Sequence, residues 1–305
     1  MALLMQERSL ANMQDAARAT ERGRSVLVGL IGAGIQGSLT PAMHEREGDA
    51  QGLRVLYQKI DLAQLNLGVE ALPELLTAAE RMGFCGLNVT YPAKQAVIAH
   101  LHDLSDDARA LGAVNTIVLQ NGRRIGHNTD WWGFAEGFRR GLPGAALDRV
   151  VQLGAGGAGA AVAHALLTLG ARELVLSDVD PNRAVDLAEA LCARFGAGRA
   201  RGAGDLQADL ARADGLVHCT PTGMDKLPGL PLPADYLHGG LWVAEIVYFP
   251  LETELLRRAR ALGCRTVDGG GMAVFQAVEA FRLFTGIAPD AERMRAHFAG
   301  LTGAG

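Results

Sequence analysis

The feature that most constrains the fold is a GxGxxG stretch, Gly154–Gly159, between an apolar run and an apolar helix pattern. The run before it, Val150–Leu153, begins with two β-branched residues, which are typical of a buried strand. The segment after it, Ala158–Leu169, is rich in alanine and leucine, which favour a helix. In such a unit the glycines allow a tight turn, and the phosphates of a dinucleotide sit at the helix N-terminus. The stretch therefore predicts part of a dinucleotide-binding fold.

Apolar runs typical of strands alternate with helical patterns along the 305-residue chain. The expected strands are Ser25–Ile31, Val55–Lys59, Gly86–Val89, Thr116–Gln120, Val150–Leu153, Leu174–Ser177, Gly215–His218, Trp242–Glu245 and Arg265–Val267. The expected helices are Leu72–Met82, Ala158–Leu169, Asn182–Phe195, Glu252–Leu262 and a final helical segment, Met272–Ala299, which we expect to pack back on the first part of the chain. This alternation predicts right-handed βαβ units and mostly parallel sheets.

A break near Gly126–Asp130 separates two series of strands, so the pattern predicts an α/β fold of two domains with a cleft between them. We expect an N-terminal α/β substrate domain with a mostly parallel sheet, formed by residues 1–127 and 272–305. A Rossmann dinucleotide-binding domain is expected over residues 128–271. Residues 1–24 are expected to form a short extra helix or a loose tail, because their apolar start is too short for a signal peptide.

The charge and the cysteine content of the chain argue against several classes of function. The chain has 29 basic and 33 acidic residues, and this net charge of −4 argues against a nucleic-acid partner. Residues 150–171 carry no charge but contain five glycines, which argues against a membrane span. The four cysteines form no CxxC pair, and His100 and His102 do not share a helical face, so no metal site is expected. We expect a cytoplasmic protein, either a monomer or a homodimer.

A second GxGxxG stretch, Gly32–Gly37, offers an alternative dinucleotide site, because Asp61 ends a predicted strand downstream of it. However, it is followed by Ser38–Pro41, where we expect a hydroxyl side chain to cap a helix and proline to occupy its first turn. The stretch Gly154–Gly159 runs directly into its helix. The strand that follows it ends before Asp178, near the expected spacing of about 20 residues for the acid that accepts the ribose hydroxyls. We therefore favour Gly154–Gly159.

The residue at position 178 bears on the choice of cofactor. A carboxylate attracts a free ribose diol and repels a ribose phosphate. No arginine or lysine occupies positions 179–182, and Arg183 is the first basic residue after Asp178. This pattern predicts NAD rather than NADP. The alternative is that Asp178 only caps the next turn.

Three polar segments lie where a predicted strand gives way to a loop: Asn88–Lys94, Gly112–Thr116 and Gly126–Asp130. In open α/β sheets this edge is where ligands bind. Their asparagine, threonine, lysine and aspartate side chains supply the donors and acceptors that a polyhydroxy substrate requires.

These segments resemble those of the shikimate/quinate dehydrogenase family, and the likeness runs in order from about residue 27 to residue 299. Ser38–Pro41 resembles a family motif Ser-x-Ser/Thr-Pro before a helix, and Asn88–Lys94 resembles Asn-Val-Thr-x-Pro-x-Lys. The family's Asn-Thr-Asp run, its Tyr-x-Pro-x-x-Thr segment and its Gly-x-Gly-Met-x-x-x-Gln element are matched by Asn128–Asp130, Tyr248–Thr253 and Gly269–Gln276. Five motifs in order are far more specific than any one of them.

The resemblance implies that Lys94 and Asp130 form a catalytic pair. Oxidation of an alcohol by NAD requires a group that removes the hydroxyl proton, and an amine can do this in its neutral form. Burial favours the neutral amine, whereas a neighbouring carboxylate favours the ammonium ion. We therefore expect Asp130 to orient Lys94 and the substrate hydroxyl. The alternative is a surface lysine and a helix-capping aspartate.

The resemblance also implies the residues that bind the substrate and the cofactor. Ser38 and Thr40 would hold the substrate carboxylate, and its hydroxyls would be held by Asn88, Thr90, Asn115, Tyr248 and Gln276. The cofactor would be held by Gly154, Ala155, Gly156, Gly157, Ala158, Gly159, Asp178, Thr220, Pro221, Gly223, Met224, Val247, Gly269 and Met272.

Departures from the family pattern point to one of its branches. Many biosynthetic shikimate enzymes have serine where this chain has Thr40, and an Asn-Arg-Thr/Ser run where it has Ser177–Val179. Thr40 and Asp178 together resemble the NAD-using branch that oxidises quinate as well as shikimate, while Gly37 replaces a usually polar residue. We expect interconversion of quinate with 3-dehydroquinate and of shikimate with 3-dehydroshikimate, with NAD as cofactor. The alternatives are an NADP-dependent biosynthetic shikimate dehydrogenase and a non-catalytic protein that senses these acids.

Overall fold

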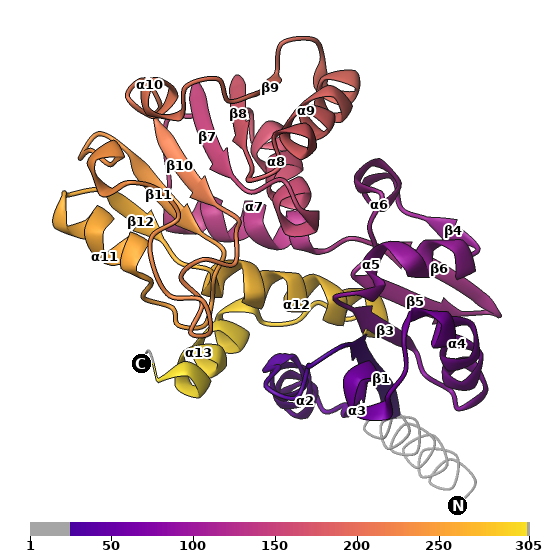
Figure 1. Ribbon diagram of the computed structural model, residues 1–305. Helices are drawn as coiled ribbons and strands as arrows, with labels where there is room; N and C mark the ends of the chain where they lie inside the picture. Colours follow the sequence, from indigo (N-terminus) through magenta and orange to yellow (C-terminus); the bar gives the residue numbers. More distant parts are fainter. Residues whose placement is uncertain (1–24, 304–305) are drawn as a thin grey trace, which may run out of the picture.

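The computed structural model describes residues 25–303, and the expectation for residues 1–24 lies outside that range. The chain forms two α/β units, each built on a six-stranded sheet, as Figure 1 shows. Apolar positions of the central strands are buried on both faces, because helices cover both sides of each sheet. The predicted two-domain α/β fold is confirmed.

The N-terminal sheet has the strand order β2-β1-β3-β5-β6-β4. Its strands are β1 (Ser25–Gly32), β2 (Arg54–Asp61), β3 (Gly86–Val89), β4 (Asp103–Leu104), β5 (Thr116–Gln120) and β6 (Arg123–His127). Strand β1 pairs in parallel with β2 and β3, and β4 pairs in parallel with β6. Only β5 runs antiparallel to its two neighbours. The sheet is thus mostly parallel, as predicted.

The C-terminal sheet is parallel throughout and has the order β12-β11-β10-β7-β8-β9. Its strands are β7 (Arg149–Leu153), β8 (Glu173–Ser177), β9 (Ala200–Gly202), β10 (Gly215–His218), β11 (Trp242–Glu245) and β12 (Arg265–Val267). Counted from β7, this is the 3-2-1-4-5-6 order of a dinucleotide-binding sheet. The order reverses between β7 and β10, and ligands of such sheets bind beyond the carboxyl ends of the strands at that point.

Helices connect these strands and link the two units. The N-terminal unit carries α2 (Thr40–Ala50), α3 (Leu62–Leu65), α4 (Leu72–Arg81), α5 (Ala93–Ala96) and α6 (Asp106–Leu111). The C-terminal unit carries α8 (Gly157–Thr168), α9 (Pro181–Phe195), α10 (Leu206–Leu210) and α11 (Glu254–Ala261). Two further helices, α7 (Asp130–Gly141) and α12 (Gly270–Thr285), lie between the units, and α13 (Ala291–Thr302) follows.

All nine expected strands are present, and three strands were not predicted: β4, β6 and β9. Strand β6 forms a hairpin with β5. The connection is Asn121-Gly122, and both residues have positive φ angles, of 54° and 70°. Asn-Gly is a preferred two-residue hairpin turn for this reason, so the sequence did contain a signal for β6.

The prediction of one helical segment over 272–299 is wrong in its continuity. Helix α12 ends at Thr285, because Gly286 adopts the left-handed conformation with φ of 74°. A new helix, α13, begins after Asp290, whose side chain accepts a hydrogen bond from the Arg293 backbone N–H. The break turns α13 back along the N-terminal unit.

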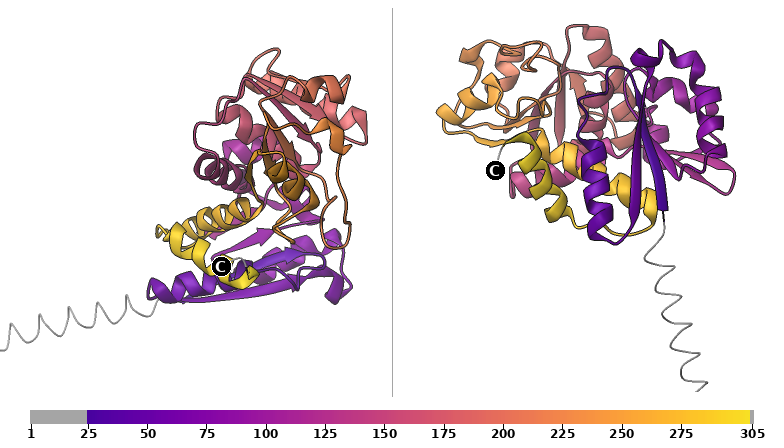
Figure 2. Two further views of the ribbon diagram at one scale, coloured as in Figure 1. Left: turned by 90° about the vertical axis from the view of Figure 1, so that its left-hand side faces the viewer. Right: turned by 90° about the horizontal axis from the view of Figure 1, so that it is seen from below.

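The C-terminal helices do pack on the N-terminal unit, as predicted. Phe284 of α12 lies in a cluster with Val26 and Val28 of β1. Arg293 of α13 pairs with the buried carboxylate of Glu47 in α2, with Nη2 and Oε1 2.6 Å apart. The right-hand view of Figure 2 shows α13 beside α2. The two ends of the described chain therefore belong to one packed unit.

Helices α7 and α12 meet backbone to backbone, because glycine occupies the contact. A Cβ atom at Gly133 would lie 2.6 Å from the Gln276 nitrogen and 2.8 Å from the Met272 oxygen. A Cβ atom at Gly137 would lie 3.1 Å from the Gly271 carbonyl carbon. The contact fixes Met272 and Gln276 relative to the first turn of α7, which begins with Asp130.

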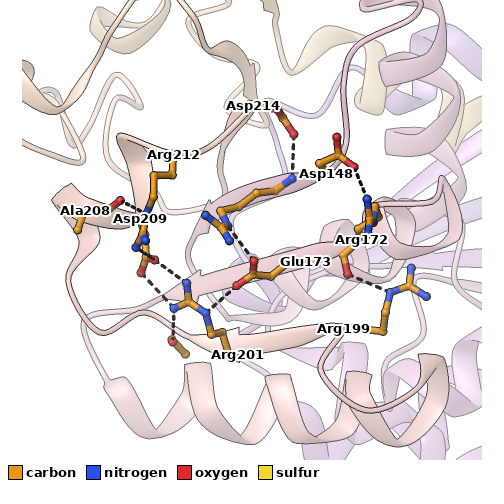
Figure 3. A network of polar contacts seen from close by, with 11 residues as sticks. Asp148, Arg172, Glu173, Arg199, Arg201, Ala208, Asp209, Arg212 and Asp214 are labelled. Atoms are coloured by element: carbon orange, nitrogen blue, oxygen red, sulfur yellow. Dashed lines mark hydrogen bonds and ion pairs between the residues drawn. The ribbon is translucent and has the colours of Figure 1, made fainter.

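The amino ends of strands β7 and β8 carry a network of ion pairs, drawn in Figure 3. The Glu173 carboxylate bridges two arginines, with 2.8 Å to Nε of Arg149 and 2.8 Å to Nε of Arg201. Arg201 also pairs with the buried carboxylate of Asp209 at 2.5 Å. A second cavity of about 430 Å³ lies here, but its charged side chains largely bind one another. This edge is opposite to the one at which a Rossmann sheet binds its ligand.

Candidate active site

A cavity of about 440 Å³ lies between the two units at the carboxyl ends of their strands. The N-terminal unit supplies the loop after β1, the start of α2 and the segment after β3. The C-terminal unit and the linking helices supply Ala158, Ile246, Tyr248, Gly269 and Met272, among others. The predicted cleft is therefore lined by residues from both sequence halves.

Lys94 and Asp130 meet in this cavity. Lys94 lies in α5, which begins directly after the Tyr91-Pro92 cis peptide, and Asp130 is the first residue of α7. The distance from Nζ of Lys94 to Oδ2 of Asp130 is 2.6 Å. The side chains are 27% and 12% exposed, respectively, so the pair is largely shielded but still reachable from the cavity. The two residues that the family motifs paired thus form one polar centre.

Asn115 fixes the orientation of Asp130. Its Nδ2 donates to Oδ1 of Asp130 over 2.8 Å and to Oγ1 of Thr129 over 3.0 Å. Its Oδ1 accepts the Thr129 backbone N–H over 2.7 Å. The Asp130 carboxylate also sits at the N-terminus of α7, where the helix dipole stabilises negative charge. Oδ2 is left directed at Lys94.

Asn88 is held by an adjoining network. The Tyr57 hydroxyl donates to Oδ1 of Asn88 over 2.7 Å, and Nδ2 of Asn88 donates to Oγ1 of Thr116 over 3.0 Å. Burial raises the pKa of Tyr57 well above its ordinary value, so the phenol keeps the proton that it donates. The network fixes the floor of the cavity behind Lys94.

All seven residues predicted to bind substrate line the cavity: Ser38, Thr40, Asn88, Thr90, Asn115, Tyr248 and Gln276. The Ser38 hydroxyl accepts the Thr40 backbone N–H over 3.3 Å at the start of α2. Tyr248 is 46% exposed and lies on the opposite side of the cavity, in the C-terminal unit. Hydroxyl and amide groups therefore face the Lys94–Asp130 pair from both sides.

The glycine-rich loop after β7 has the geometry of a phosphate cradle. Gly154 has a φ of 100°, and a Cβ atom there would lie 2.7 Å from the Cys219 oxygen. A Cβ atom at Gly159 would collide with the Gly154 oxygen. Helix α8 begins at Gly157, so its free N–H groups point at the loop. The backbone thus leaves room for a pyrophosphate at a helix N-terminus.

The Asp178 carboxylate lies against this loop. Its Oδ2 accepts the Ala155 backbone N–H over 2.7 Å, and its Oδ1 accepts the Asp180 N–H over 3.0 Å. The aspartate therefore does cap the next turn, the alternative considered above, and also borders the glycine-rich loop. Arg183 is directed at Asp180, with Nε 3.6 Å from Oδ2.

The residues predicted to bind cofactor fall into two groups. Ala158, Gly269 and Met272 line the cavity itself. The others lie outside that cavity: Gly154, Ala155, Gly156, Gly157, Gly159, Asp178, Thr220, Pro221, Gly223, Met224 and Val247. The loop over residues 219–224 packs on the glycine-rich loop, since a Cβ atom at Gly154 would lie 3.1 Å from Cγ2 of Thr220. The glycine-rich loop thus borders both Asp178 and the loop over residues 219–224.

The alternative dinucleotide site, Gly32–Gly37, is closed by its own chain. The Asp61 carboxylate accepts the backbone N–H groups of Gly34 and Ile35 over 2.9 and 3.1 Å. It also accepts Nε2 of Gln36 over 3.0 Å, and this hydrogen bond, aided by the backbone ones, lowers the pKa of Asp61. Helix α2 begins only at Thr40. The first glycine stretch therefore lines the substrate cavity and holds a carboxylate of the protein.

Sequence reasoning missed several residues that shape the site. Tyr57 and Thr116 hold Asn88, as described above. Gln152 donates from Nε2 to the carbonyl oxygens of Gly154 and Gly159, over 2.8 and 2.9 Å. A glutamine within an otherwise apolar buried strand was the available signal. His218 and Glu245 form a buried pair for which no local motif exists.

None of the helices within residues 25–303 has the length and apolar character that a membrane-spanning segment requires. In the same residues, no group of three histidine, cysteine or acidic side chains is arranged to hold a metal ion.

Comparison with known proteins agrees with this geometry. The family description "Shikimate dehydrogenase substrate binding domain" matches residues 30–117, and "Shikimate 5'-dehydrogenase C-terminal domain" matches residues 269–297. The chain is 63% identical to a shikimate dehydrogenase (NADP(+)) of Streptomyces avermitilis over 92% of this chain and 97% of the relative. It is 51% identical to a quinate/shikimate dehydrogenase (NAD(+)) of Corynebacterium efficiens over 91% of this chain and 99% of the relative.

A solved structure is also similar. The quinate dehydrogenase from Corynebacterium glutamicum in complex with NAD superposes with a TM-score of 0.86 and 48% identity, over 91% of this chain and 99% of that one. The fold, the shared cavity with its amine–carboxylate pair and these similarities lead to one conclusion: the chain belongs to the shikimate/quinate dehydrogenase family of nicotinamide-dependent oxidoreductases.

Proposed function

We propose that the protein is an NAD-dependent dehydrogenase that oxidises the C3 hydroxyl of quinate and shikimate, giving 3-dehydroquinate and 3-dehydroshikimate. The observation that supports it most is the contact of 2.6 Å between Nζ of Lys94 and Oδ2 of Asp130, inside a cavity that both units line. Polar side chains surround this contact, as a ring with several hydroxyls requires.

Lys94 is the group that exchanges the substrate proton. A bound nicotinamide supplies the hydride acceptor, so the chain must supply a base for the hydroxyl proton. The neutral amine of Lys94 accepts that proton during oxidation, and the ammonium ion returns it during reduction. Asp130, held by Asn115, keeps Nζ at one position and stabilises the ammonium ion.

The remaining cavity residues orient the ring. Ser38 and Thr40 lie at the start of α2, where backbone N–H groups and the helix dipole favour a carboxylate. Thr90, Tyr248 and Gln276 face the same space and offer hydroxyl and amide groups to the substrate hydroxyls, with Asn88 and Asn115 behind them. When the substrate carboxylate is held at the start of α2, a hydroxyl on the far side of the substrate ring lies near Lys94.

Preference for NAD rests on Asp178. Its carboxylate lies beside the glycine-rich loop, where it would accept hydrogen bonds from a ribose diol and repel a ribose phosphate. The solved quinate dehydrogenase that is 48% identical to this chain was determined in complex with NAD.

NADP-dependent oxidation or reduction of shikimate is the second candidate. It is favoured by the relative from Streptomyces avermitilis, which is 63% identical and is named a shikimate dehydrogenase (NADP(+)). Arg183, in the first turn of α9, is the basic residue that would have to turn toward a ribose phosphate in this case.

An absorbance assay separates these candidates. Purified protein is incubated with quinate or shikimate and with NAD or NADP at alkaline pH, where release of a proton favours oxidation. We expect the highest kcat/KM with NAD. A higher kcat/KM with NADP would support the second candidate, and binding of the acids without NADH or NADPH formation would indicate a sensor.

The Lys94→Ala variant tests the base. We expect turnover to fall about 100-fold or more, with a modest loss of substrate binding, because the proton acceptor is removed. Lys226→Ala, which alters an exposed lysine, is the matched control and should retain wild-type turnover. Near-normal turnover of Lys94→Ala would exclude the proposed role of Lys94.

A further inference from the structure

A buried hydrogen-bonded pair, His218 and Glu245, lies at the carboxyl ends of β10 and β11. His218 and Glu245 are adjacent across these strands, and both side chains are 0% exposed. Nδ1 of His218 is 2.9 Å from each carboxylate oxygen of Glu245. Because a carboxylate only accepts, the hydrogen of this contact is on Nδ1 of the histidine.

Each partner also holds a loop. Nε2 of His218 is 2.5 Å from Oγ1 of Thr220, which accepts the Thr222 backbone N–H over 3.3 Å. Oε1 of Glu245 accepts the Val247 backbone N–H over 3.0 Å. The pair therefore connects the loop over residues 219–224 to the loop over residues 246–253.

Glu245 reaches the far end of the second loop as well. Its Oε2 accepts the hydroxyl of Thr253 over 3.1 Å, and that hydroxyl caps α11 by accepting the Leu256 N–H. Val247 and Thr253 bracket Tyr248, which lines the substrate cavity. One carboxylate thus holds both ends of the segment that presents Tyr248.

The two loops lie on opposite parts of the proposed binding surface. Thr220 contacts the first glycine of the glycine-rich loop, since a Cβ atom at Gly154 would lie 3.1 Å from its Cγ2. The second loop meets the start of α12, where a Cβ atom at Gly269 would lie 2.5 Å from the Ile246 and Val247 oxygens. A chain of contacts runs from the glycine-rich loop through His218 and Glu245 to the cavity.

We propose that His218 and Glu245 are positioning residues that hold the dinucleotide-binding loop at Thr220 in register with the substrate loop at Tyr248. They touch neither ligand and act through Thr220, Val247 and Thr253. A purely apolar pair at these positions would fill the space but leave the two loops free to shift independently. This inference rests on the proposed function, because it assumes that Thr220 lies along the dinucleotide.

The first test isolates the link between His218 and Thr220. In His218→Asn, the amide nitrogen replaces Nδ1 and keeps the contact with Glu245, but no atom replaces Nε2. In Thr220→Val, the hydroxyl is replaced by a methyl group of similar size. We expect each variant to weaken NAD binding by about three- to tenfold, the range of one hydrogen bond, while the KM for quinate or shikimate changes less. Thr220→Ser, which keeps the hydroxyl, should restore NAD affinity.

A double-mutant cycle distinguishes positioning from a general structural role. If both side chains act through one bond, the double variant His218→Asn/Thr220→Val should bind NAD no more weakly than the weaker single variant. If the losses of NAD affinity in the two single variants multiply in the double variant, the proposal is overturned. Unchanged NAD affinity in both single variants would overturn it as well. His238→Asn is the matched control, since His238 binds the Leu210 oxygen elsewhere in the same unit.

Stability and wild-type activity complete the test. Melting temperatures of all variants are measured with and without NAD, and a fall in NAD affinity in variants that melt like the wild type supports positioning. A loss of affinity that only follows a loss of melting temperature would overturn it. If the wild type binds neither NAD nor NADP, the proposed function itself fails. By contrast, normal NAD binding by the wild type together with normal NAD binding by the variants would overturn only the positioning role.

Discussion

The units β1–α2–β2 and β7–α8–β8 share a parallel pair of strands, a GxGxxG stretch after the first strand and an aspartate at the end of the second. In the first unit, Asp61 accepts the N–H groups of the glycine loop and the amide of Gln36. In the second, Asp178 accepts one N–H group from the loop, at Ala155. The first loop thus gives three hydrogen bonds to its own aspartate, whereas the second gives one.

The start of the following helix explains the difference. Helix α8 begins at Gly157, within the motif, and presents its N-terminus to the loop. Helix α2 begins at Thr40, after the motif has ended, so its N-terminus faces the substrate cavity instead. Under the proposed function, the same glycine spacing serves a dinucleotide in one unit and a small acid in the other. The position at which the helix begins, relative to the glycine motif, determines which space its N-terminus faces.

Substitution of the third glycine of each motif should give the largest contrast. Gly159→Ala places a Cβ atom against the Gly154 oxygen, whereas a Cβ atom at Gly37 has no heavy atom within 4 Å. We expect Gly159→Ala to weaken NAD binding by about 100-fold, because α8 must move away from the loop. Gly37→Ala should bind NAD like the wild type. Titration calorimetry measures both affinities, and circular dichroism checks that both variants fold.

Equal NAD affinity in the two glycine variants would contradict the assignment of different roles to the two motifs. So would a loss of NAD binding confined to Gly37→Ala.

The two aspartates offer the next contrast. Asp178→Ala should weaken NAD binding by about tenfold or more, because a charged acceptor of the ribose hydroxyls is lost. NADP binding should change less or improve, since a repelling charge is removed as well. The measurement is the ratio of dissociation constants for NAD and NADP. A ratio that stays the same in Asp178→Ala would show that the carboxylate does not contact the ribose.

Asp61→Asn should give the smallest effect, and on stability alone. The hydrogen bonds from Gln36 and the backbone lower the pKa of folded Asp61, so the carboxylate stabilises the fold above its unfolded pKa of about 3.9. This contribution is lost as pH falls through the lower pKa of the folded state. We expect the variant to melt a few degrees below the wild type at pH 7, and the gap to close below about pH 4.

NAD affinity of Asp61→Asn at pH 7 should equal that of the wild type. A weakened affinity without a change in melting temperature would place a dinucleotide contact at the first motif.

Much of this comparison could be predicted from the sequence, because it depends on local patterns. Strand runs, the glycine motif that enters a helix directly and Asp178 at the end of the next strand all lie within one βαβ unit. The placement of Lys94 beside Asp130 followed from the family motifs, since the two residues are far apart in the chain. The fold explains it, as α5 follows β3 and α7 follows β6 at the same sheet edge.

The contact between His218 and Glu245 is one that no local pattern encodes. His218 and Glu245 meet only because β10 and β11 pair in register. The end of α12 was missed although Gly286, Pro289 and Asp290 follow Thr285 and are local signals for the end of one helix and the start of the next. Strand β6 was missed because its sequence, Arg123–His127, is polar, although the Asn121-Gly122 turn before it is a local hairpin signal.

The backbone contact between α7 and α12 has a consequence for how the molecule can open and close. Gly133 lies one turn after Asp130, and it touches the backbone of Gln276, which lines the cavity. The two helices therefore move together, and rotation of one sheet against the other has to occur in the connections outside this crossing. A side chain at position 133 would push α7 away from α12, and it would thereby move the Asp130 carboxylate away from Gln276.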